Sequence, residues 1–270
     1  MIESHPQTES TTEKRALRRR RNLLVGAAIL LLLFSLSLWA WRQYTALPEP
    51  KVYFQEDFAQ GIEGWQTLDA TWLKEQGAVR LASQNYAAPY LARSVPLEQA
   101  PPEAFVWHFQ VRVSSFTDEA VVLGALVLPH STVAVVVNGE GRLGVAHDLF
   151  APPSYTTALL ARLPKDEWQD IYLLLSDREK KLEVYLNNRR VITKEWLEPV
   201  FPVQQIWLGA LWLKGAGNYG APLDVSYKST TLGNKGILPR PSFLGFLLDL
   251  VGSGWQQIKS ALMKVAQGNT

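Results

Sequence analysis

The sequence predicts an antiparallel β-sandwich tethered to a membrane by one helix near the N-terminus. Three observations support this prediction. Residues 23–41 are apolar and carry no charge, residues 51–232 alternate short apolar-periodic segments with turn signals, and residues 244–265 repeat apolar side chains at helical spacing. Many short strands at regular spacing are typical of a sandwich. The expected fold class is therefore all-β, with a membrane helix before the sandwich and an amphipathic helix after it.

Residues 1–22 are polar and charged, which is typical of a disordered tail. Basic residues are concentrated just before the apolar run, whereas Arg42 is the only one close behind it. The positive-inside rule therefore places the tail in the cytoplasm. The arginines are also expected to contact lipid headgroups. They are Arg18, Arg19, Arg20 and Arg21.

The apolar run 23–41 has the length of a transmembrane helix, about 28 Å at 1.5 Å per residue. At the end of the run, Trp39, Trp41 and Tyr44 mark the outer interface as an aromatic belt. A cleaved signal peptide is the competing interpretation. It requires a shorter apolar core and small residues at the cleavage site. This run ends in Trp-Ala-Trp-Arg, which favours an uncleaved signal anchor.

Residues 42–50 include Pro48 and Pro50 and are expected to form a short stiff linker. The chain contains no cysteine, which excludes disulfides, thiolate nucleophiles and thiol zinc sites. An exported domain without disulfides fits the bacterial inner membrane, with the main domain periplasmic or extracellular. The net charge of +2 gives no reason to expect nucleic acid as a partner.

Strand periodicity is clearest over residues 105–113, where every second residue from Phe105 to Val113 is apolar. Residues 182–187 alternate in the same way and are followed by the turn Asn187-Asn188 and a partner strand at 190–193, which predicts a hairpin. Residues 223–231 predict a further strand. Runs that are apolar on both faces are expected to be central strands covered on each side. These runs are 121–128, 133–137, 171–175 and 206–213.

Several motifs occur in an order known from one family. The domain opens with Glu56-Asp57-Phe58, Gly61 and Gly64-Trp65, and later has Trp168-Gln-Asp-Ile-Tyr-Leu followed by Leu182-Glu-Val-Tyr-Leu-Asn-Asn. This order resembles concanavalin A-like (laminin-G-like) domains over roughly residues 52–232. The resemblance implies a jelly roll, with domain bounds at 51–233. One departure is Asn188, where the family usually has Gly. The family includes lectins, glycan-cleaving enzymes and contact modules, so function has to be argued from the site.

Carbohydrate binding needs an aromatic platform with polar groups beside it. Two expected strand faces and one loop offer such groups. The alternative is that these faces meet water while the tryptophans, Trp107 included, fill the core. The candidate ligand-binding residues are His108, Gln110 and Arg112 on one strand, Glu183, Tyr185 and Asn187 on another, and Tyr219 in the loop 214–220.

Catalytic and metal motifs are absent from the sequence. Glycosidases of this family use a Glu-x-Asp-x-x-Glu spacing, and no Glu here is followed two residues later by Asp. The histidines show no ligand spacing. The chain is therefore expected to be a non-enzyme without a cofactor. Structural calcium held by loop oxygens of Asp118, Asn138 and Asp148 stays open as an alternative.

The C-terminal residues 240–267 predict an amphipathic helix that follows Pro239, Pro241 and a capping Ser242. Two interpretations stay open. The helix covers the sandwich or a partner protein, or it lies in the membrane interface. The interfacial residues would then be Phe243, Phe246 and Trp255.

The leading hypothesis is a non-catalytic, membrane-anchored binding module. Its expected partners are the lipid bilayer and a glycan, an envelope polymer or an envelope protein. A structural scaffold subunit of a membrane complex is the alternative. A divergent glycan-cleaving enzyme is the third hypothesis, and it would need two facing carboxylates in a groove.

Overall fold

The computed structural model describes residues 9–44, 47–68, 72–81, 90–95, 104–116, 120–148, 154–199, 202–212 and 224–239. These residues fall into two units, the N-terminal helix and the sandwich of Leu47–Ser242. The predicted C-terminal helix 240–267, the loop 214–220 and residues 1–8 lie outside the described residues.

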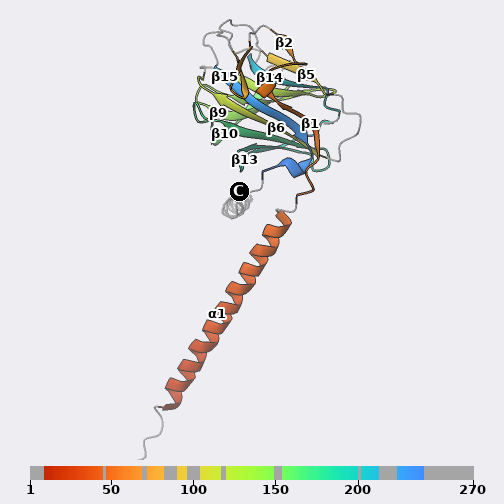
Figure 1. The fold of residues 1–270 in the computed structure, drawn as a ribbon. Coiled ribbons are helices and arrows are strands. Elements are labelled where there is room, and N and C mark those ends of the chain that lie inside the picture. The colour runs from red at the N-terminus through yellow and green to blue at the C-terminus, as the bar shows by residue number, and fades with distance from the viewer. Residues whose placement is uncertain are drawn as a thin grey trace, which may run out of the picture. The chain divides into compact units, whose positions relative to one another are not determined.

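The N-terminal helix α1 spans Glu9–Tyr44 (Figure 1). Its window Asn22–Trp39 has a mean hydropathy of 2.2 with none of it buried, so it has the length and composition of a membrane span. Residues 9–22 are helical, although the sequence pattern suggested a disordered tail. They contain no Gly or Pro and are rich in Arg, Glu and Lys, which are good helix formers. Adding residues to an existing helix is also easier than starting one.

The sandwich consists of two antiparallel sheets, which confirms the predicted fold class. Two short 3₁₀ turns accompany them, η1 (Phe58–Gln60) and η2 (Lys235–Ile237). The eight-stranded sheet has the order β13 (Arg189–Glu195), β12 (Lys181–Leu186), β11 (Gln169–Ser176), β6 (Ala104–Val113), β15 (Val225–Gly233), β4 (Ala78–Leu81) and β3 (Trp72–Glu75), with β1 (Val52–Asp57) also paired to β15. The seven-stranded sheet has the order β10 (Ser154–Arg162), β9 (Arg142–His147), β8 (Thr132–Val137), β7 (Val121–Val127), β14 (Gln205–Trp212), β5 (Tyr90–Ser94) and β2 (Gln66–Leu68).

The strand patterns expected from the sequence are confirmed. In β6 the alternate residues from Phe105 to Val113 are buried in the core. Strands β12 and β13 pair as the predicted hairpin. The four runs expected to be apolar on both faces form β7, β8, β11 and β14, although Tyr172 of β11 is only half-buried. In the hairpin turn the left-handed residue is Asn187, with φ of 53°, rather than Asn188.

The core between the sheets depends on close contacts of large aromatic residues. Trp107 of β6 is fully buried and faces Gly124 of β7, where an added Cβ would lie 2.6 Å from the indole. The indole Nε1 donates to Thr230 Oγ1 at 2.9 Å. Tyr227 of β15 donates its hydroxyl to the Leu123 carbonyl at 2.6 Å. Burial raises the pKa of Tyr227 above its usual value, so its hydroxyl stays a donor.

The segment that leads into the sandwich is bound to it. Asn234 accepts hydrogen bonds from Lys51 N (3.0 Å) and Gly236 N (2.9 Å) through Oδ1, and donates to the Glu49 carbonyl (2.8 Å) through Nδ2. Gly236 lies against Pro48 and Pro50, with no room for a side chain. Residues 48–51 are therefore fixed at the end of β15, which the expected linker 42–50 did not anticipate.

We expect Gly124→Ala to lower the free energy of unfolding by about 1–3 kcal/mol, because the added methyl group overpacks the core against Trp107. The measurement is urea denaturation of the full chain in detergent. In the double variant Gly124→Ala/Trp107→Phe the smaller ring relieves the clash. The double variant should therefore lose less unfolding free energy than the two single variants lose in total. Strict additivity would contradict this account of the contact.

Candidate functional site

The outer face of the eight-stranded sheet brings together the two groups of candidate residues. Strand β11 lies between β6 and β12, with Tyr172 opposite both His108 and Tyr185. Asp170 lies opposite Gln110 in the adjacent row. The strand residues predicted from the sequence therefore share one surface, which β11 completes.

The centre of this surface is a His–Tyr–Asp cluster. The His108 ring stacks on Tyr172 with centroids 4.3 Å apart and planes 23° apart, and its Nε2 lies 2.8 Å from Asp170 Oδ1. Burial, followed by the charge of Asp170, raises the pKa of Tyr172 to about 12. The phenol therefore stays neutral at physiological pH. Gln110 makes no side-chain hydrogen bond to another described residue.

Glu183 is buried, although strand alternation placed it on a solvent-facing surface. Its exposed fraction is 2%, and its carboxylate accepts hydrogen bonds from Tyr185 Oη (2.8 Å) and Arg190 Nη1 (3.0 Å). Lys181 Nζ lies 3.2 Å away. Burial alone would lower the pKa of Lys181, but Glu179 and Glu183 outweigh this effect and raise it. Glu183 therefore holds neighbouring side chains together rather than facing a ligand.

Asn187 also has a structural position. Its Oδ1 accepts a hydrogen bond from Asp170 N (3.0 Å), and its Nδ2 donates to Gln169 Oε1 (2.8 Å). These bonds fix the end of the β11–β12 pair. Tyr219, the remaining candidate, lies outside the described residues.

An open groove lies at one end of the same face. It has a volume of about 790 Å³ and is lined by Lys74, Glu75, Gln76, Ala78, Arg112 and Trp168. The Arg112 guanidinium lies over the Trp168 ring, 5.1 Å from the centroid. Its Nη2 donates to Glu75 Oε2 (2.9 Å) and Ser226 Oγ (3.3 Å). Arg112 is thus held over the indole at the groove wall.

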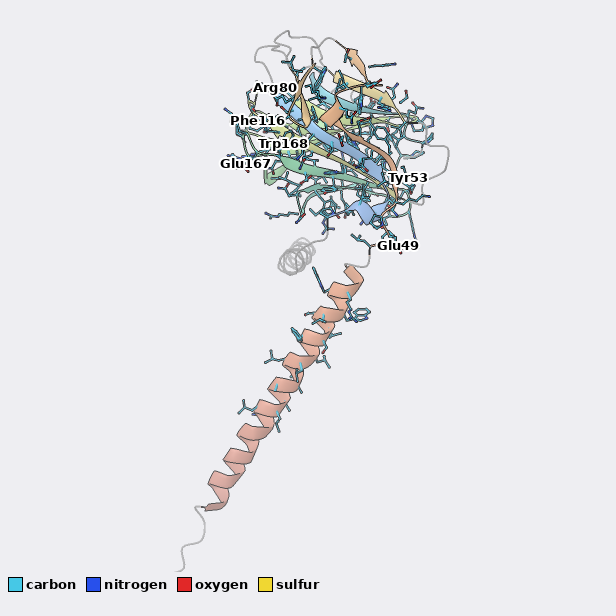
Figure 2. All side chains as sticks on the ribbon, viewed as in Figure 1. Glu49, Tyr53, Arg80, Phe116, Glu167 and Trp168 are labelled. Atoms are coloured by element: carbon cyan, nitrogen blue, oxygen red, sulfur yellow. The ribbon has the colours of Figure 1, made fainter. Side chains whose placement is uncertain are left out.

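The groove and the incoming linker lie at opposite ends of β6. Arg112 is near the end of this strand, whereas Ala104 at its start lies beside Asn234, which binds the linker. Eight residues of β-strand extend about 26 Å. Figure 2 labels Trp168 at one end of the sandwich and Glu49 at the other.

Sequence reasoning missed Trp168, Asp170, Tyr172 and Glu75. The motif 168–173 contributes to the family resemblance, and the pattern of 171–175 predicts a strand that is apolar on both faces. In the structure Tyr172 is half-buried at the surface. Glu75 comes from the β3–β4 hairpin, far away in the sequence. The alternation of Trp168, Asp170 and Tyr172 was the signal in the sequence that could have identified the outward-facing residues of β11 and the groove beside them.

The candidate metal and catalytic groups can be located in part. Within the described ranges no group of three or more His, Asp or Glu could hold a metal ion. Asn138 Oδ1 accepts from Glu140 N (3.1 Å) and Arg142 N (2.8 Å), so it serves the β8–β9 turn. Asp148 is left-handed with φ of 54°, and Asp118 lies outside the described residues. The groove lining contains one carboxylate, Glu75, which is bonded to Arg112.

Comparison with known proteins supports the fold. A sialidase is 12% identical with a TM-score of 0.50, over 70% of this chain and 19% of its own. A receptor binding domain is 9% identical with a TM-score of 0.50, over 73% of this chain and 46% of its own. The CBM2 module of the evolved Dit protein from Lactobacillus casei BL23 phage J-1 is 10% identical with a TM-score of 0.49, over 70% of this chain and 97% of its own.

These similarities concern the fold, a jelly-roll-like β-sandwich as the sequence resemblance implied. The chain spans about a fifth of the length of the sialidase and just under half of the receptor binding domain. No family model matches the sequence, and no curated protein matches it.

We expect Glu183→Gln to destabilise the sandwich by about 1–3 kcal/mol, because Lys181 and Arg190 lose their shared buried charge partner. Chemical denaturation of the full chain in detergent measures the effect. Glu195→Gln on the neighbouring strand β13 is the matched control, since Glu195 is exposed. Equal stability of the two variants would show that the buried cluster contributes nothing.

Proposed function

We propose that this protein is a membrane-anchored, non-catalytic binding module that receives a glycan or another polymer of the cell envelope in the groove at Arg112 and Trp168. The observation that carries the proposal is the Trp168 indole with the Arg112 guanidinium over it in an open, polar groove. Aromatic rings with convergent hydrogen-bonding groups are the usual means of gripping a sugar.

The lining favours an acidic ligand. Lys74 and Arg112 are cationic and Glu75 is the only carboxylate among the described lining residues. A polymer with carboxylate or phosphate groups would gain charge-assisted hydrogen bonds from the two cations. Gln76 adds an amide that can hydrogen-bond to the hydroxyl groups of an acidic or a neutral polymer. A single carboxylate bonded to an arginine does not supply the pair that glycoside hydrolysis requires.

Membrane anchoring supports a display role. Helix α1 has the length and composition of a membrane span, and four arginines precede its apolar part. The positive-inside rule then orients the helix with its N-terminus in the cytoplasm and the sandwich outside. This orientation would place the sandwich, with its groove, on the envelope side of the membrane.

Trp168→Ala should reduce binding to a glycan array at least tenfold, because the stacking platform is lost and Arg112 loses its support. The measurement uses the full chain in detergent on an array that includes acidic polysaccharides. Arg112→Ala should weaken acidic ligands more than neutral ones. Tyr53→Ala, an aromatic residue of the same sheet outside the groove lining, is the matched control.

Binding that survives in Trp168→Ala but fails in Tyr219→Ala would move the site to the loop 214–220. Absence of binding to every glycan would count against this function and favour the scaffold role.

The absence of cysteine allows a direct test of topology. Two variants each carry a single introduced cysteine. Ser94→Cys should react with a membrane-impermeant maleimide in intact bacterial spheroplasts. Ser10→Cys should react only after the membrane is permeabilised. Ser94 is exposed on the sandwich. The reverse labelling pattern would refute the proposed orientation, and a shortened chain would indicate cleavage.

A further inference from the structure

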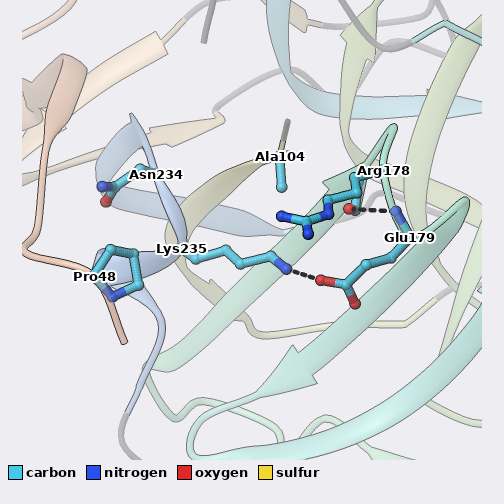
Figure 3. A pocket seen from close by; sticks show the side chains of 7 residues that line it. Pro48, Ala104, Arg178, Glu179, Asn234 and Lys235 are labelled. Carbon is cyan, nitrogen blue, oxygen red and sulfur yellow. Dashed lines mark hydrogen bonds and ion pairs between the residues drawn. The ribbon is translucent and has the colours of Figure 1, made fainter. Parts of the chain in front are cut away.

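A second hollow lies at the linker end of the eight-stranded sheet, outside the groove. It has a volume of about 250 Å³ and is lined by Pro48, Ala104, Ser176, Arg178, Glu179, Asn234 and Lys235 (Figure 3). At about 30 Å³ for each water molecule, this is room for about eight waters or one phosphate ester with part of its alcohol.

The hollow combines a polar floor, cationic side chains and apolar walls. Ser176 is 1% exposed, and its hydroxyl accepts a hydrogen bond from Glu179 N at 3.1 Å. The Ser176 hydroxyl proton has no acceptor among the described residues. A buried donor without a partner favours an incoming oxygen ligand. Ala104 and Pro48 supply the apolar walls.

The charge around the hollow is positive. Among the described lining residues Arg178 and Lys235 are cationic and Glu179 is anionic, which leaves a net charge of +1. Glu179 pairs with Lys235 and with Lys181. Burial would raise the pKa of Glu179, but the hydrogen bonds from Lys181 and Lys235 outweigh it and lower the pKa. The ionised carboxylate therefore holds the Lys235 ammonium at the wall of the hollow.

The chain that connects α1 to the wall of this hollow is short. Pro48 belongs to its wall and is fixed there by the hydrogen bonds of Asn234 to Glu49 and Lys51. Pro48 follows Tyr44, the last residue of α1, by four residues. Four residues span at most about 14 Å. A ligand in the adjoining membrane surface would be held at high effective concentration.

We propose that this hollow binds the phosphodiester of an anionic phospholipid in the membrane that α1 spans. Arg178 and Lys235 pair with the phosphate oxygens, the Ser176 hydroxyl donates to one of them, and the glycerol carbons lie against Pro48 and Ala104. The inference rests on the proposed membrane anchoring. It adds a contact that fixes the sandwich to the lipid surface at the end away from the groove.

Native mass spectrometry of the full chain in neutral detergent tests this proposal with water-soluble dihexanoyl lipids. Dihexanoyl phosphatidylglycerol should bind at least fivefold more tightly than dihexanoyl phosphatidylcholine. Arg178→Gln/Lys235→Gln should abolish that preference. The matched control Lys165→Gln/Lys228→Gln removes two exposed lysines outside the hollow and should retain it. Inorganic phosphate should bind more weakly than phosphatidylglycerol.

Equal phosphatidylglycerol binding by the wild type and the double variant would overturn the site. Inorganic phosphate that matches the lipid would overturn the lipid as its source. Arg178→Lys/Lys235→Arg keeps both charges and should bind, which separates a lost site from a lost fold. Because these lipids are soluble monomers, the result does not depend on topology, and a failure here is distinct from a failure of the labelling test.

Discussion

The contact between Trp107 and Gly124 is the constraint on which the rest of the sandwich depends. It joins β6 of one sheet to β7 of the other at a distance that only a glycine allows. The bond from Tyr227 to the Leu123 carbonyl joins the neighbouring strand β15 to β7 beside Gly124. Because side chains alternate along a strand, an indole that must face inward at 107 forces residues 108, 110 and 112 outward. The polar outer face is thus a direct consequence of core packing.

Strand β6 runs from the linker end of that face to the groove at the other end. Asn234 binds the incoming chain at Glu49 and Lys51, so the linker end of the sheet is fixed without help from the helix. The groove at Arg112 then lies about 26 Å away along an unbroken strand. A module with this arrangement keeps its attachment and its groove apart, and neither can obstruct the other.

Alternation in the sequence predicted the inward and outward faces of β6 and β12, because period two depends only on neighbouring residues. It could not predict that β11 lies between these strands, because pairing joins segments about 60 residues apart. For the same reason it missed that Glu75 and Trp168 meet at Arg112. It also missed that Arg190 and Lys181 bury Glu183, because alternation places a side chain on one face of the sheet but does not say which neighbouring side chains cover it. The helical form of residues 9–22 was missed because charge was taken as a sign of disorder, although these residue types have high helix propensity.

The centre of the outer face is poorly suited to a ligand, even though most of the predicted residues lie there. His108 already contacts Asp170, and Tyr185 already donates to Glu183. A ligand at these positions would have to replace bonds that are made, and each partner left unpaired would cost about 1–3 kcal/mol. At the two ends Arg112 and Lys235 are also paired, with Glu75 and Glu179, but Trp168 lines an open groove and the Ser176 hydroxyl proton has no described acceptor. The bonds already made at the centre therefore favour the ends of the strands as the positions of the two proposed sites.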